Sequence, residues 1–236
     1  RSNAALEEFA SVASHDLQEP LRAVITHTRL LARSCDGRLD ERAAQHLHYV
    51  IDGASRMQAL IEDLLLVSRI GTHGHAFQAV DLDALVGTVV HSLDESLRSS
   101  GGVVVTGVLP IVQGDEAQLG QLFLNLIGNA LKFHHPGRAP RVVVAARPDV
   151  AGWRLSISDN GIGIAPEFRE RVFQLFKRLH TPEEFPGTGI GLSICRKVVE
   201  RHGGRIWIED GPGRGTSLVF TLPRDATRDR PADGAA

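Results

Sequence analysis

The sequence carries the stretch NLIGNALKF at residues 125–133, inside a segment, 116–133, whose pattern predicts a helix. Asn125, Asn129 and Lys132 follow one another at spacings of four and three residues, so they share one helix face. Two amide oxygens and one ammonium suit a polyphosphate with a bound divalent cation, because such cations prefer oxygen ligands. Taken alone, the stretch favours the plainer interpretation of a polar stripe on an amphipathic helix.

Two glycine-rich stretches follow, DNGIGI at residues 159–164 and GTGIGL at residues 187–192. The first ends a predicted strand and the second opens a predicted helix. Glycines let the backbone approach a ligand closely, and a helix N-terminus favours phosphate. Asp159 is suited to accept a hydrogen bond from an exocyclic amine such as adenine N6. Neither stretch fits the Walker or Rossmann patterns, but both together with the asparagine face favour a nucleotide site.

The segment between the glycine stretches contains FQLFKR at residues 173–178. It predicts a short helix, followed by a mobile lid over residues 179–186, where two prolines limit regular structure. Lys177 and Arg178 either contact a terminal phosphate or are simply solvated, and the sequence leaves both interpretations open.

The remaining C-terminal sequence alternates between strand and helix patterns. Further helices are predicted at residues 81–97 and 190–201. Short strands are predicted at residues 103–105, 111–112, 141–147, 153–159, 205–209 and 216–222. Mixed strands and helices of this kind predict a sheet that is covered by helices on one face.

The first seventy residues predict two long helices separated by the turn signal SCDG at residues 34–37. Each helix carries a heptad stripe, which is typical of packed helices. The stripes consist of Leu6, Ala10, Ala13, Leu17, Pro20, Val24, His27 and Leu31, and of Ala43, Leu47, Val50, Ala54, Met57, Ile61, Leu64 and Ser68. Other apolar positions widen both stripes, so we expect an antiparallel hairpin that forms a four-helix bundle as a homodimer.

His15 lies two residues from Ala13 and from Leu17 of the heptad stripe, so it is expected to point outward. An exposed imidazole is largely neutral and nucleophilic at pH 7, and Asp16 is placed to accept its proton. Pro20 lacks the N–H that would bond the Asp16 carbonyl, so a bend is expected beside the histidine. The alternative for any exposed helical histidine is simple solvation.

Composition sets outer limits on function. The chain has 236 residues, 42% of them hydrophobic and 23% charged, and its net charge of −2 gives no sign of binding to nucleic acid or to a membrane surface. Cys35 and Cys195 match no metal or redox spacing, which favours two reduced thiols. No apolar run reaches the ~20 residues that cross a bilayer. We expect a cytoplasmic segment whose sensor domain lies upstream and is absent from this chain.

In order, these motifs resemble the sensor histidine kinases over residues 6–223. FASVASHDLQEPL at residues 9–21 is similar to the family's phosphoacceptor box. Its sequence most resembles that of kinases that follow phytochrome or PAS sensor domains. The asparagine, glycine and phenylalanine stretches, with GRGT at residues 213–216, resemble its other boxes. The resemblance implies an α+β protein. Its parts would be a helical hairpin over 1–70, a linker over 71–80, a Bergerat-type α/β sandwich with a mixed sheet over 81–224 and a disordered tail over 225–236.

The resemblance also implies a chemistry. His15 would accept the γ-phosphoryl group of ATP with Asp16 as general base, and would pass it to an aspartate of a response-regulator receiver domain. Asn129 would ligate Mg²⁺ and Asp159 would bind adenine. The other implied ATP-binding residues are Asn125, Lys132, Gly161, Gly163, Lys177, Gly187, Thr188, Gly189, Gly191, Leu192 and Thr216.

Glu19 departs from the family pattern, in which Thr or Asn often stands four residues after the histidine and orients a water for dephosphorylating the regulator. A carboxylate there would repel an aspartyl phosphate, although Gln18 could take over the role. One alternative is therefore a regulator phosphatase with weak or no kinase activity. Two others are an Hsp90-like or gyrase-like ATPase, which the His15 hairpin disfavours, and a dimerisation module without enzymatic activity, which the nucleotide motifs disfavour.

Overall fold

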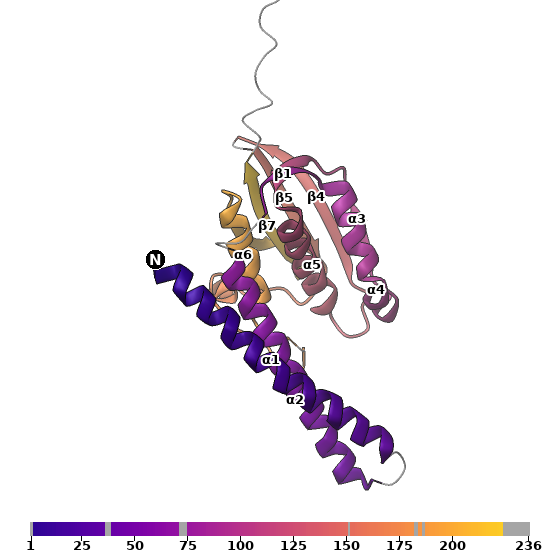
Figure 1. Ribbon diagram of the computed structural model, residues 1–236. Helices are drawn as coiled ribbons and strands as arrows, with labels where there is room; N and C mark the ends of the chain where they lie inside the picture. Colours follow the sequence, from indigo (N-terminus) through magenta and orange to yellow (C-terminus); the bar gives the residue numbers. More distant parts are fainter. Residues whose placement is uncertain are drawn as a thin grey trace, which may run out of the picture.

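The computed structural model describes residues 2–35, 39–70, 75–150, 152–181, 184–185 and 187–223, with the backbone alone for residues 2–16 and 66–69. The described chain has two parts (Figure 1). The hairpin comprises residues 2–69 and the α/β unit comprises residues 75–223. This arrangement confirms the predicted fold class.

Two long helices form the hairpin, α1 (Ser2–Ser34) and α2 (Glu41–Arg69). Asp40 starts α2, because its carboxylate accepts a hydrogen bond from the backbone N–H of Ala43 at 2.7 Å. That bond satisfies one of the donors that the first turn of a helix leaves open. The predicted hairpin is confirmed, and α1 continues as one helix through Pro20.

The contact between α1 and α2 uses a different stripe of α1 from the predicted heptad seam. Ile25 and Ala54 are buried, whereas Leu17 and Val24 of the predicted seam are 54% and 44% exposed. The prediction of which α1 face joins the two helices is therefore wrong, because the heptad stripe points away from α2 in this chain. The prediction that His15 points outward assumed that Leu17 faces the helical core, but Leu17 is exposed. The His15 side chain itself lies outside the described residues, so its direction stays a prediction.

A five-stranded mixed sheet forms the centre of the α/β unit, with strand order β2-β4-β5-β7-β6. β2 pairs parallel with β4, and the other neighbours are antiparallel. The strands are β2 (Val103–Thr106), β4 (Arg141–Asp149), β5 (Gly152–Asp159), β6 (Ile206–Asp210) and β7 (Thr216–Pro223). A second sheet pairs β1 (Gln78–Asp81) with β3 (Ile111–Gly114).

Helices α3 (Leu82–Ser92), α5 (Glu116–Lys132) and α6 (Gly191–Arg201) cover one face of the large sheet (Figure 1). The core lies between these helices and the sheet. Phe123 of α5 and Phe220 of β7 are fully buried there, and their rings meet edge-on with 5.9 Å between centroids. The predicted layering of helices on one face of a mixed sheet is confirmed.

The prediction of one continuous helix over residues 81–97 is wrong, although residues 82–92 and 94–97 are helical as predicted. Strand β1 runs to Asp81, and two helices follow, α3 and the short α4 (Asp94–Ser100), separated at Leu93. The Asp81 carboxylate accepts hydrogen bonds from the backbone N–H groups of Asp83 and Ala84, so it caps α3 where the strand stops. Strand β1 also lies inside the range 71–80 that was expected to be a linker, since its backbone pairs with β3.

The short helix predicted at residues 173–178 is also wrong. The described chain makes 3₁₀ turns at Pro166–Phe168 and Arg171–Phe173 and is then irregular. Phe176 has a φ of 62°, in the left-handed region that a right-handed helix cannot include. Part of the predicted lid, at residues 182, 183 and 186, lies outside the described residues, as do residues 71–74 and 224–236.

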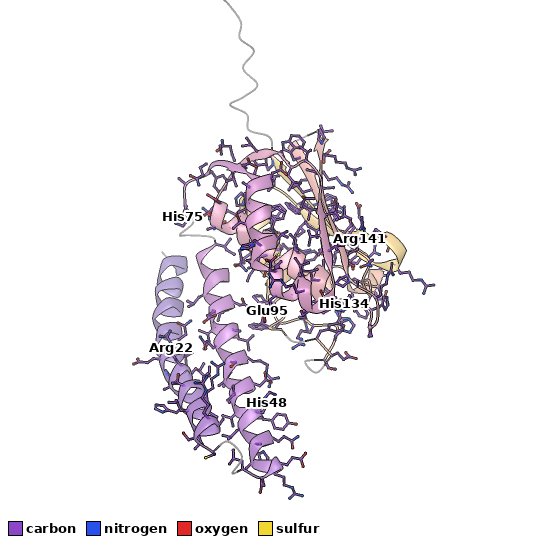
Figure 2. All side chains as sticks on the ribbon, turned by 90° about the vertical axis from the view of Figure 1, so that its right-hand side faces the viewer. Arg22, His48, His75, Glu95, His134 and Arg141 are labelled. Carbon is purple, nitrogen blue, oxygen red and sulfur yellow. The ribbon has the colours of Figure 1, made fainter. Side chains whose placement is uncertain are left out.

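The chain enters the α/β unit at His75, labelled in Figure 2. Its backbone N–H donates to the Asp115 carboxylate at 2.8 Å, and Phe77 stacks on His202 with 4.6 Å between centroids. Asp115 caps α5. The His202 Nδ1 lies 2.8 Å from the Val198 carbonyl and Nε2 accepts from the Asp115 N–H at 3.0 Å, so the proton belongs on Nδ1. These contacts connect the incoming chain to both α5 and α6.

Both cysteines are free, as predicted: Cys35 follows α1 and Cys195 is buried in α6. Within the described part of the chain, none of the helices combines the length and the apolar character that a membrane crossing requires.

Candidate active site

A cavity of about 250 Å³ opens between the end of α5, the strand ends of β5 and β7 and the start of α6. It brings together every residue predicted to bind ATP except Gly161. The predicted residues in its wall are Asn125, Asn129, Lys132, Asp159, Gly163, Lys177, Gly187, Thr188, Gly189, Gly191, Leu192 and Thr216. Motifs that are up to ninety residues apart in sequence therefore share one cavity.

The asparagine face of α5 forms one wall of this cavity. The Asn125 Nδ2 donates to the Gly191 carbonyl at 3.4 Å, and its Oδ1 accepts from Gln121 at 3.2 Å. Asn125 thereby links α5 to the start of α6. Asn129, one turn further along, lines the cavity, and its side-chain amide has no hydrogen-bond partner among the described residues. Its oxygen is available to a ligand.

Asp159 is the buried carboxylate of the cavity. Its Oδ1 accepts two hydrogen bonds, from the N–H of Gly161 at 2.8 Å and from the N–H of Thr216 at 3.0 Å. Burial raises the pKa of Asp159, and these two bonds oppose the rise. The Oδ2 receives no hydrogen bond from the described residues, so it is free to accept one from a ligand.

The surroundings of Asp159 are apolar and closely packed. Ile162, Val172 and Leu218 line the cavity with it, which suits a flat heterocyclic ring. Gly161 does not line the cavity, but a Cβ at this position would lie 2.1 Å from the Phe133 carbonyl. The glycine is therefore needed to let the first glycine stretch pass the end of α5.

Lys132 and Arg178 supply positive charge to the same cavity. Burial and then the charge of Arg178 lower the pKa of Lys132. Neither side chain forms an ion pair with a carboxylate among the described residues. Arg178 donates to the carbonyls of Phe185 at 2.6 Å and Gly187 at 2.8 Å, so it also holds the second glycine loop, residues 187–191.

Sequence reasoning missed an aromatic cluster at the cavity. The rings of Phe133 and Phe185 lie 4.9 Å apart, and that of His180 lies 5.1 Å from Phe185. Two of these residues fall in the segment that was expected to be a lid, where no periodic pattern marks a buried position. Sequence reasoning also missed Asp63 of α2, the one cavity residue that the described hairpin supplies.

His15 and Asp16 lie within α1, and their side chains are outside the described residues. None of the described residues in the cavity wall comes from α1. The structure therefore assembles the predicted nucleotide residues, whereas the side chain of the predicted phosphoacceptor lies outside the described residues.

Comparison with known families agrees with this two-part organisation. Residues 5–73 match the family described as "His Kinase A (phospho-acceptor) domain". Residues 114–226 match the family described as "Histidine kinase-, DNA gyrase B-, and HSP90-like ATPase". The chain belongs to the sensor histidine kinases. The recognised family is thereby confirmed, and the match to a phosphoacceptor domain disfavours a gyrase-like or Hsp90-like ATPase.

The proteins similar to this chain include phytochromes. The chain is 42% identical to cyanobacterial phytochrome A of Nostoc sp. over 94% of its length, which is 29% of that protein. It is 40% identical to the phytochrome-like protein Cph1 of Synechocystis sp., over 94% of this chain and 30% of that protein. The chain thus spans less than a third of these relatives.

Solved histidine kinase structures share the fold. Full-length ShkA in complex with AMPPNP superposes with a TM-score of 0.71 at 27% identity, covering 92% of this chain and 45% of that chain. The mycobacterial sensor histidine kinase MprB superposes with a TM-score of 0.54 at 32% identity, covering 62% of this chain and 97% of that chain. The match to ShkA covers both the hairpin and the α/β unit.

Proposed function

We propose that this chain is the catalytic core of a sensor histidine kinase, which uses ATP to phosphorylate His15 and then transfers the phosphoryl group to an aspartate of a response-regulator receiver domain. One observation carries the proposal. A single cavity combines apolar walls with the buried carboxylate of Asp159, one oxygen of which accepts no hydrogen bond from the described residues. It also contains two cations, Lys132 and Arg178, that have no carboxylate partner among these residues. Adenine and a polyphosphate require that combination.

The donor set fits Mg²⁺ as well. Asn129 offers an unpartnered amide oxygen, and no cluster of three His, Cys, Asp or Glu side chains in the described chain could hold a metal by itself. Mg²⁺ takes few protein ligands and prefers phosphate oxygens and water. Asn129 would be its protein ligand, and the ion would neutralise phosphate charge when bound.

The transfer to His15 follows from the chemistry of the two side chains. One imidazole nitrogen attacks the γ-phosphorus, the bond to the β,γ-bridging oxygen breaks, and ADP leaves with the electron pair. Asp16 accepts the proton of the other ring nitrogen. The resulting phosphohistidine donates its phosphoryl group to the receiver carboxylate.

A homodimer is part of the proposal. Leu17, Val24 and Leu31 are exposed along one side of α1, as are Val50 and Leu64 along α2. A second hairpin would bury both stripes and complete a four-helix bundle. The similarity to phytochromes supports a role as the output part of a phytochrome-like photoreceptor, and a need for ATP would be consistent with a cytoplasmic location.

The test is autophosphorylation with γ-labelled ATP and Mg²⁺. The unmodified chain should gain acid-labile label, and His15→Gln should gain none. His46→Gln is the matched control, because His46 is an exposed histidine of the same hairpin that lies off both heptad stripes, and it should leave labelling unchanged.

If ATP binds but neither the unmodified chain nor the control is labelled, the kinase proposal is wrong for this chain. The second candidate, a regulator phosphatase, would then be tested with a phosphorylated receiver domain. Glu19 bears on that outcome, since its exposed carboxylate lies on α1 four residues after His15. Glu19→Thr should raise dephosphorylation if the charge is what suppresses it.

A further inference from the structure

Asp63 connects the hairpin to the nucleotide cavity. It lies on α2, its side chain is half-buried, and it is the hairpin's one contribution to the described cavity wall. Its Oδ2 accepts a hydrogen bond from the Thr188 hydroxyl at 2.5 Å, across 125 residues of sequence. Thr188 stands in the second glycine loop, between two glycines with φ angles of 146° and 76°.

The contact extends along one face of α2. Residues at spacings of three and four, namely Gly53, Arg56, Met57 and Leu60, line a crevice of about 380 Å³ against Arg178, Gly187 and Thr188. Asp63 continues the same face by three residues. The hairpin therefore docks on the loop that Arg178 holds in place and that forms part of the cavity.

The Thr188 hydroxyl has one proton to donate. In this structure that proton goes to Asp63, while the hydroxyl oxygen accepts from the Ile190 N–H at 3.4 Å. A phosphate oxygen in the cavity offers Thr188 a second acceptor, so Asp63 and the phosphate compete for one donor. The carboxylate also adds a negative charge to a cavity that would receive several more, and burial strengthens their repulsion.

We infer that Asp63 is a positioning residue that couples nucleotide occupancy to docking of the α/β unit on α2. Its carboxylate holds Thr188 when the cavity is empty, and the nucleotide phosphates displace it. By linkage, whatever weakens the Asp63 contact tightens phosphate binding, and the bound nucleotide weakens docking by the same factor. This inference rests on the proposed function, since it requires ATP in this cavity.

The coupling has a reason in the arrangement of the two parts. With α2 docked, the cavity wall contains Asp63 but no described residue of α1, which carries His15. A nucleotide that releases the Asp63 contact would free the α/β unit to move relative to α2 once ATP is bound.

The experiment is titration calorimetry of the unmodified chain, Asp63→Asn and Glu62→Gln with adenosine, ADP and ATP in the presence of Mg²⁺. Asp63→Asn keeps the shape and an acceptor oxygen but removes the charge. It should lower the Kd for ATP at least about fivefold, the Kd for ADP less, and the Kd for adenosine not at all. Glu62→Gln removes an exposed neighbouring charge that does not contact Thr188, so it should bind all three ligands like the unmodified chain.

The outcomes separate this inference from the proposed function. An unmodified chain that binds no nucleotide would overturn both. Normal ATP binding with equal affinity in Asp63→Asn, or weaker affinity, would overturn the inference alone. If Asp63→Asn loses adenosine binding, Asp63 maintains the structure of the cavity and does not act on the phosphates, which would also overturn the inference. If Glu62→Gln gains the same affinity for ATP as Asp63→Asn, the gain would come from the lower net negative charge of the chain. That result would contradict a specific role for Asp63.

Discussion

Ile25 and Ala54 are the buried apolar side chains of α1 and α2 in the described hairpin, whereas the α/β unit encloses a continuous core in which Phe123 and Phe220 have no exposed surface. The hairpin leaves its longest apolar stripe open, whereas the α/β unit leaves apolar side chains open mainly in loops and on strand β2. The difference indicates that the α/β unit is stabilised by its own interior, and we expect the hairpin to gain stability when a second hairpin covers its open stripe.

The largest expected effect tests the interior of the α/β unit. Phe123→Ala should lower its free energy of unfolding by about 3–5 kcal/mol, because it removes a fully buried ring and leaves a cavity. Leu31→Ala, at an exposed hairpin position, should change the same transition by less than about 0.5 kcal/mol. Both tryptophans, Trp153 and Trp207, lie in the α/β unit, so guanidinium unfolding followed by their fluorescence reports this part alone. Equal losses in the two variants would contradict the comparison.

A smaller effect concerns the open stripe of the hairpin. Val24→Glu should raise the dissociation constant of the homodimer at least about thirtyfold, since it places a charge in the surface that the second copy buries. Arg22→Glu is the control, because Arg22 is exposed on the same helix and off the stripe (Figure 2). Sedimentation measures both, and unaltered association of Val24→Glu would show that the stripe is not the interface. Tryptophan-monitored unfolding of the α/β unit should stay unchanged.

The smallest effect compares a buried with an exposed histidine. Burial lowers the pKa of His202 below its ordinary 6.5, and protonation would place a second donor against the Asp115 N–H. Below pH 6.5 the unfolded chain therefore binds more protons than the folded chain. The free energy of unfolding should fall as the pH drops below about 6.5, and should level off below the folded-state pKa.

His202→Gln should remove most of that slope between pH 7.5 and 5.5 in the same denaturation experiment. His48→Gln, at an exposed hairpin histidine (Figure 2), should keep the slope of the unmodified chain. A slope that survives in His202→Gln would assign the pH dependence to other groups.

Periodicity predicted the elements whose signal is local. The hairpin, the mixed sheet and helix α5 lie where the sequence placed them, because their apolar residues recur at helical or strand spacing. The helix predicted at 81–97 was correct for most residues, but Asp81 caps it at its start and Leu93 interrupts it. The prediction of a helix at 173–178 was wrong because Phe176 has a left-handed φ, and nothing in the local sequence indicates that conformation.

The cavity shows the same limit. The asparagine and glycine stretches predicted most of its wall, because each motif has a chemistry that can be read alone. Asp63 and the ring cluster of Phe133, His180 and Phe185 could not be predicted, since their role depends on tertiary contacts between distant segments. The heptad stripe of α1 was found correctly as apolar, but the sequence could not say whether α2 or another chain covers it.

The two cysteines differ in a way that has a practical consequence for spectroscopy. Burial raises the pKa of Cys195 to about 12, so at neutral pH it offers almost none of the thiolate that reacts with maleimide dyes. Cys35, partly exposed at the far end of α1, is the thiol that remains for labelling. The chain can therefore be labelled at a single point beside the hairpin turn without engineered cysteines. Energy transfer from Trp153 and Trp207 to a dye on Cys35 would then measure movement between the α/β unit and the hairpin.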